Sequence, residues 1–236
     1  MRYDLLLADA DGTLYDFHAG ERVALEETLA HSGIPYDGDI GALYSSVNLS
    51  HWKKLERGET TQERLRVERF ADFLAELAQR GWPTGNKTAQ EMSQTFVAAL
   101  SRQRIPMPGA EAFLRAVSAK MPVFLVTNGI AVVQRGRFEQ SELRPYIADI
   151  LISEELGHVK PDPFMLLEGM RRAGVTDRRR VVMLGDSLTA DIGAAKAAGV
   201  DSILITQGAQ APQGCDATHV ALSLADAARI VLAGHA

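Results

Sequence analysis

Short, uninterrupted apolar runs recur along the chain, and each ends in polar or glycine-rich residues. They lie at 5–8, 123–126, 150–152, 181–184 and 202–205. Continuous hydrophobicity of this length is typical of strands that are covered on both faces, as in a parallel sheet. Helical patterns at 109–119, 130–141, 163–173 and 188–198 separate the later runs, and Gly174 and Gly199 follow two of them as C-terminal caps would. This alternation predicts an α/β fold with a doubly wound, Rossmann-like parallel sheet.

The stretch between the first two apolar runs has a different pattern. It contains long amphipathic patterns typical of helices, at 61–80 and 87–102, and no convincing strand. A segment of this length is too long to be a loop. We therefore predict an α/β core domain made of residues 1–16 and 106–236, with a helical domain of residues 17–105 inserted after the first strand.

Composition and charge narrow the classes of function. A chain of 236 residues with 46% hydrophobic residues can bury a core without disulfides, and its one cysteine, Cys215, excludes an internal disulfide. This cysteine usage predicts a reducing, cytoplasmic location. The formal net charge of −5 provides no basic field for nucleic acid, and no segment approaches the ~18 apolar residues of a membrane span. We therefore expect neither a nucleic-acid polymer nor a membrane as a partner.

Candidate functional residues are sought directly after each predicted strand, because open parallel sheets bind ligands at the carboxyl ends of their strands. Asp9 and Asp11 come directly after the first run, and Gly12 allows the backbone to turn there. Two carboxylates in one pocket repel each other unless a cation or a shared proton intervenes, and Mg²⁺ prefers oxygen ligands. The alternative for this segment alone is an Asp-Gly turn with a helix cap at Thr13.

The later strand ends are followed by Thr127-Asn128-Gly129, by Lys160 before Pro161, and by Asp186 with Asp191. A hydroxyl and backbone amides at a helix start make an anion site, a lysine neutralises phosphate or a carboxylate, and a further carboxylate completes a magnesium site. Taken singly, these residues have other interpretations: a helix cap for Thr127, a solubilising lysine for Lys160, and an acidic partner of a helix dipole for Asp191. Residues able to bind ions or phosphate follow four successive strands, and this recurrence favours a single site.

These residues resemble the four motifs of the haloacid dehalogenase superfamily over nearly the whole chain. The motifs are Asp9-x-Asp11-Gly12-Thr13, Thr127-Asn128-Gly129, Lys160-Pro161 and Gly185-Asp186-x4-Asp191. The helical insert stands where this superfamily carries its type 1 cap domain. Members that cleave carbon–halogen bonds lack a carboxylate at the position of Asp11, so the resemblance implies a phosphatase.

The resemblance also implies a role for each residue of the reaction. Asp9 would be the nucleophile that forms an aspartyl phosphate, and Asp11 the general acid and then base. Thr127, the backbone amide of Asn128, and Lys160 would bind the phosphate oxygens.

A magnesium ion is implied by the same resemblance. Asp9, the backbone carbonyl of Asp11, and Asp186 would hold Mg²⁺, and Asp191 would support the ion through a bound water.

Other positions resemble bacterial housekeeping pyrimidine 5′-nucleotidases more closely. They are Asn48, Trp52, Gly58 and Thr61 in the insert, Gln134 and Arg137 after the second motif, and the run Ser153-Glu154-Glu155-x-Gly157 before the third. This implies a small phosphorylated metabolite, specifically a nucleoside 5′-monophosphate, as substrate. Gly12 departs from these nucleotidases, which often carry an acidic or amide residue there.

Two other interpretations stay open at this point. One is a phosphatase of phosphoglycolate or of a sugar phosphate. The other is a binding or regulatory member of the superfamily that has lost catalysis; the presence of Asp9, Asp11, Lys160 and Asp186 disfavours it.

Overall fold

The computed structural model describes residues 3–233, and its α/β part is built on one parallel sheet. The strands are β1 (Leu5–Ala8), β2 (Val123–Thr127), β3 (Asp149–Ile152), β4 (Val181–Gly185), β5 (Asp201–Ile205) and β6 (His219–Ala221). Their order in the sheet is β3-β2-β1-β4-β5-β6, and every neighbouring pair is parallel. The predicted doubly wound fold is confirmed. The apolar pattern missed β6, a three-residue edge strand whose central Val220 is exposed.

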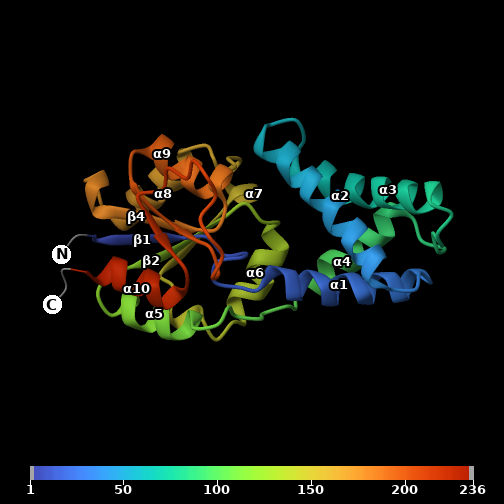
Figure 1. Ribbon diagram of the computed structural model, residues 1–236, viewed down its shortest axis with the longest axis horizontal. Helices are drawn as coiled ribbons and strands as arrows, with labels where there is room; N and C mark the ends of the chain where they lie inside the picture. The colour runs from blue at the N-terminus through green and yellow to red at the C-terminus, as the bar shows by residue number, and fades with distance from the viewer. Residues whose placement is uncertain (1–2, 234–236) are drawn as a thin grey trace. The chain divides into compact units, whose positions relative to one another are not determined.

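Helices cover both faces of this sheet, as the unbroken apolar runs required. Alternate residues of β1 point to opposite faces, so Leu6 belongs to one apolar cluster and Leu7 to the other. The first cluster includes α5 (Ala110–Ser118) and α10 (Leu224–Leu232), and the second includes α8 (Phe164–Ala173) and α9 (Gly193–Ala198) (Figure 1). Burial on both sides explains why β1 and β4 carry no polar side chain and why β2 carries none before Thr127.

Further helical segments lie along the chain between the strands. They are α6 (Ala131–Glu139), η1 (Arg144–Tyr146), α7 (Ser153–Leu156), η2 (Arg178–Arg180) and η3 (Leu188–Ile192). Gly174 and Gly199 end α8 and α9 with the left-handed backbone (φ of 70° at both) that the sequence predicted. The helical pattern predicted over 188–198 corresponds to two helices in succession, the π-helix η3 and then α9. The N–H of Ile192 donates to the carbonyl of Ser187 at 3.1 Å, which is the i→i+5 bond of this wider turn.

The strand order reverses next to β1, and this reversal defines a ligand-binding edge. The chain runs outward from β1 through β2 to β3 and then returns to β4 on the other side of β1. In open α/β sheets the crevice at such a switch point, at the carboxyl ends of the strands, receives the ligand. Here the switch lies between β1 and β4, and the N–H of Asp9 extends their pairing by donating to the carbonyl of Leu184 at 2.8 Å.

The inserted region forms a separate helical unit. Contacts group residues 18–103 with 132–137, and the helices are α1 (Phe17–Ser32), α2 (Gly38–Glu56), α3 (Gln62–Gln79) and α4 (Ala89–Leu100). Residues 132–137 of α6 belong to this unit although the sequence assigned them to the core, since Gly136 packs on Ser101 at the end of α4. Among the residues described, no helix has both the length and the apolar character to cross a membrane.

A network of buried polar side chains lies inside this unit. The Asn48 amide donates to Oε1 of Glu21 at 2.6 Å, and Nη1 of Arg69 donates to Oδ1 of Asn48 at 3.0 Å. All three side chains are buried, and the Arg69 guanidinium lies over the rings of Phe70 and Phe96. Burial raises the pKa of Glu21, against the opposing effects of the Ser45 hydroxyl and of Arg69. Asn48 therefore connects two buried groups of opposite charge that do not bond each other directly.

We expect Asn48→Ala to lower the free energy of unfolding of the helical unit by about 2–4 kcal/mol, because both Glu21 and Arg69 would lose a buried hydrogen bond. Urea unfolding followed by tryptophan fluorescence measures this, since Trp52 and Trp82 both lie in the helical unit. Ser46→Ala, at an exposed position of the same helix, is the matched control. Equal urea midpoints for Asn48→Ala and Ser46→Ala would contradict a contribution of the network to stability.

Candidate active site

Asp9 is the first residue after β1, and a tight loop follows it. Both Leu14 and Tyr15 donate their N–H groups to the carbonyl of Ala10, at 3.0 and 2.9 Å, so the chain reverses within a few residues. Gly12 has a φ of 82°, and a Cβ atom there would overlap the carboxyl group of Asp186. The glycine thus permits both the turn and the close approach of the loop after β4.

Lys160 joins three parts of the site through its ammonium group. Nζ donates to Oδ1 of Asp9, to Oδ1 of Asp191 and to the carbonyl of Val126, each at 2.6 Å. The side chain is buried, so the three donors of the ammonium group are matched by these three acceptors. Burial acts to lower the pKa of Lys160, but the charges of Asp191 and Asp9 outweigh it and raise the pKa above its ordinary value. Lys160 is therefore a fixed positive charge in the site.

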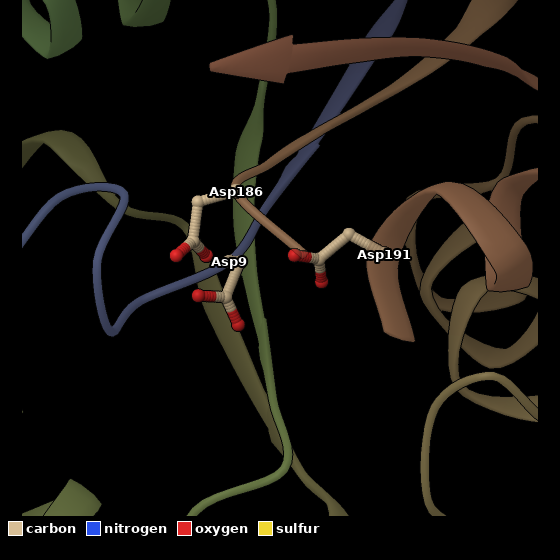
Figure 2. A group of neighbouring side chains, drawn as sticks. All are labelled: Asp9, Asp186 and Asp191. Atoms are coloured by element: carbon tan, nitrogen blue, oxygen red, sulfur yellow. The ribbon is translucent and has the colours of Figure 1, made fainter. Parts of the chain in front are cut away.

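Carboxylates of Asp9, Asp186 and Asp191 converge at the switch point from the loop after β1, the loop after β4 and η3 (Figure 2). One oxygen from each lies within 4.8 Å of the others. Burial raises the pKa of Asp9 well above its ordinary value, partly offset by Lys160 and reinforced by Asp191. Burial and the charge of Asp191 likewise raise the pKa of Asp186 to about 6. A cation bound beside these carboxylates would favour their ionised forms against the effects of burial and of the neighbouring charges.

The three carboxylates differ in how they could bind a cation. Asp191 already uses both oxygens, since Oδ1 accepts from Lys160 and Oδ2 accepts from the N–H of Ser187 at 3.0 Å. Asp9 keeps Oδ2 outside its bond to Lys160, and Oδ1 of Asp186 accepts a long hydrogen bond, 3.5 Å, from the Thr13 hydroxyl. The donor set thus fits a hard divalent cation on Asp9 and Asp186, with Asp191 behind them.

Asp11 occupies the loop after β1 but is not part of this convergent group. Its backbone forms a bridge with Tyr15, and its side chain is half-buried. The sequence grouped Asp9 with Asp11 as a pair two residues apart, whereas the structure brings Asp9 together with Asp186, which follows a different strand.

The segment Thr127-Asn128-Gly129 follows β2 and is tied to the neighbouring loop. The Asn128 carboxamide bonds the backbone of Lys160 in both directions, donating to its carbonyl at 2.9 Å and accepting from its N–H at 2.8 Å. The Thr127 hydroxyl oxygen accepts from the N–H of Gly129 at 3.1 Å. The Asn128 side chain therefore joins the loop after β2 to the backbone of Lys160.

Glu154, which the sequence analysis did not include in the site, completes the surroundings of this segment. Its Oε2 accepts from the N–H of Ala131, the first residue of α6, at 2.7 Å. The sequence predicted that backbone amides at this helix start bind an anion. One of them, the amide of Ala131, is already bonded to a carboxylate. The sequence did contain a signal for Glu154, because this residue follows the end of β3 by two positions and so also lies at a strand end.

This fold and arrangement of residues match a known family. The family model for haloacid dehalogenase-like hydrolases matches residues 3–199, and the chain belongs to that family.

Individual relatives cover most of the chain. The pyrimidine 5′-nucleotidase PynA of Streptococcus pneumoniae is 35% identical over 208 residues, which are 86% of this chain and 84% of that protein. The pyrimidine 5′-nucleotidase YjjG of Escherichia coli is 29% identical over 81% of each chain. A solved structure of the putative hydrolase YfnB of Bacillus subtilis, bound to magnesium, has a TM-score of 0.87 and 27% identity and covers 98% of this chain and 99% of its own.

We expect Gly185→Ala to destabilise the α/β unit by about 1–3 kcal/mol, because the added methyl group would overlap the carboxyl group of Asp191 and displace it from Lys160. Circular dichroism during urea unfolding measures the effect. Gly38→Ala is the control, since a Cβ atom there meets nothing within 4 Å and the backbone is helical. If both variants unfolded at the wild-type midpoint, the close packing of Asp191 against the end of β4 would not matter for stability.

Proposed function

We propose that this protein is a magnesium-dependent phosphatase that hydrolyses nucleoside 5′-monophosphates through a phosphorylated Asp9. The observation that supports it best is the carboxylate of Asp9, which lies at the switch point of the sheet with the Lys160 ammonium 2.6 Å from one of its oxygens and Asp186 beside it. The fixed charge of Lys160 favours the ionised, nucleophilic form of Asp9 despite its burial.

The reaction then proceeds in two displacements. A carboxylate oxygen of Asp9 attacks phosphorus in line, a new P–O bond forms, and the bond to the ester oxygen breaks. Asp11 gives its proton to the leaving alkoxide. A water molecule, losing a proton to Asp11, next attacks phosphorus, so that phosphate leaves and the Asp9 carboxylate is restored. Splitting one difficult step into two easier ones accelerates the overall hydrolysis.

Residues around Asp9 hold the phosphoryl group during both displacements. The Thr127 hydroxyl and the backbone amide of Asn128 bind the equatorial oxygens, where charge resides in the transition state. All three donors of Lys160 pair with protein acceptors in this structure. We therefore assign to Lys160 a contribution through its charge and through the orientation of Asp9.

Asp9 and Asp186, with the backbone carbonyl of Asp11, would hold the magnesium ion, and Asp191 would support them from its bonds to Lys160 and Ser187. When bound, the ion supplies positive charge that offsets the carboxylates and the phosphate.

The substrate class rests on similarity. PynA and YjjG are pyrimidine 5′-nucleotidases, and both align with more than four fifths of this chain. We extend their substrate class to this chain, assign the helical unit the role of a cap domain that selects the nucleoside, and place the protein in the cytoplasm, consistent with its single cysteine.

We expect release of phosphate from uridine and thymidine 5′-monophosphates to exceed that from ribose 5-phosphate and phosphoglycolate, in kcat/KM and in the presence of Mg²⁺. Asp9→Asn should lower turnover by roughly 10³-fold or more, since no other residue replaces the nucleophile. A malachite green assay of free phosphate measures both. Faster hydrolysis of phosphoglycolate or sugar phosphates would keep the mechanism and reject the nucleotide assignment, and full activity of Asp9→Asn would reject the mechanism.

Chelation should abolish turnover, because Asp186 and Asp9 repel each other and the phosphate without a cation. We expect activity to fall to background with excess EDTA and to return when Mg²⁺ is added in excess. Asp186→Asn should require a higher Mg²⁺ concentration for half-maximal activity than the wild type. Activity that persists unchanged in EDTA after exhaustive dialysis would contradict a metal requirement.

A further inference from the structure

Glu154 contacts the helix that follows the proposed phosphate-binding segment, although it lies on a different element. It belongs to α7, directly after β3, and Oε2 accepts from the N–H of Ala131 at 2.7 Å. Ala131 is the first residue of α6, four residues after Thr127. The side chain of Glu154 is half-buried, so its hydrogen bond is partly shielded from water.

This bond holds one end of a segment whose other parts are also fixed. The Asn128 carboxamide ties the segment to the backbone of Lys160 by two bonds, and the Thr127 hydroxyl accepts the N–H of Gly129. Ile130, the residue before α6, provides no side-chain cap. Glu154 therefore takes the place of the missing cap from across the strand end.

A carboxylate at this position has two physical effects. It accepts a hydrogen bond from an amide that has no partner within its own helix, and it interacts favourably with the positive end of the helix dipole. It also places negative charge at a helix start that would otherwise attract an anion. The hydrogen bond and the dipole interaction order the backbone between Thr127 and Ala131. The added negative charge weakens the binding of phosphate there.

We propose that Glu154 is a positioning residue of the proposed phosphatase reaction, which holds the Thr127–Ala131 backbone in its phosphate-binding conformation and keeps the start of α6 from retaining the product phosphate. The inference rests on the proposed function for its kinetic consequences. The substrate still binds through Thr127 and Asn128, and Glu154 acts through the backbone that it fixes.

Two substitutions separate the two effects. Glu154→Ala removes the acceptor and the charge, whereas Glu154→Gln removes the charge and keeps an oxygen that can accept from Ala131. Glu155→Ala is the matched control, since Glu155 is the next residue of α7 and is exposed. Steady-state kinetics on uridine 5′-monophosphate give kcat and KM, and product inhibition gives the inhibition constant of inorganic phosphate.

We expect Glu154→Ala to lower kcat roughly tenfold, because a small displacement of positioning groups is costly in rate. Glu154→Gln should keep kcat within about threefold of the wild type and bind inorganic phosphate about two- to fivefold more tightly, as loss of one nearby negative charge requires. Glu155→Ala should match the wild type in all three constants. Equal losses in Glu154→Ala and Glu155→Ala, or an unchanged kcat in Glu154→Ala, would overturn the proposal.

Direct binding distinguishes a failure of this inference from a failure of the proposed function. Calorimetric titration of inorganic phosphate into the Mg²⁺-loaded protein needs no turnover. If the wild type hydrolyses no phosphate ester, tighter phosphate binding by Glu154→Gln than by the wild type still supports the role of Glu154 at α6. The same affinity in both proteins overturns it, whatever the activity.

Discussion

The buried ammonium group of Lys160, shared between Asp9 and Asp191, is the interaction on which the rest of this structure depends. An unpaired charge in this position would be strongly destabilising, and here each donor has an acceptor at 2.6 Å. The acceptors come from the loop after β1, from β2 and from η3, so one side chain connects three neighbouring strand ends. The same bonds that compensate the buried charge set the ionisation and orientation of the proposed nucleophile.

The sheet order makes this meeting possible. Because β1 lies between β2 and β4, the loops that follow these strands open on the same edge. The site then requires the loops to approach more closely than side chains normally allow. Gly12 and Gly185 meet that requirement, since a Cβ atom at either position would overlap a carboxyl group of the site, that of Asp186 or that of Asp191. The carboxylates are also buried by this approach, and burial, reinforced by the neighbouring charge of Asp191, raises the pKa values of Asp9 and Asp186.

The helical unit buries charge by a different arrangement. Glu21 and Arg69 do not bond each other, and the neutral Asn48 side chain stands between them within an aromatic core. A purely apolar packing would often be at least as stable as a buried ionic group. The network links α1, α2 and α3 through specific bonds, so it fixes how these three helices pack in the unit proposed to select the substrate.

The sequence by itself determined the doubly wound sheet, the helical insert and the residues at each strand end, because strands buried on both faces leave unbroken apolar runs and ligands bind where such strands end. Tertiary structure alone decided which of these residues meet. Asp9 and Lys160 are 151 positions apart, and no local pattern indicates that Asp191 pairs with Lys160 or that Glu154 bonds the first residue of α6. The short strand β6 and the grouping of residues 132–137 with the helices also depend on distant contacts. The catalytic and metal-binding roles of the residues at the strand ends, Asp11 and Thr127 among them, stay predictions, because they concern bonds to a substrate or an ion, whereas periodicity and composition record only burial.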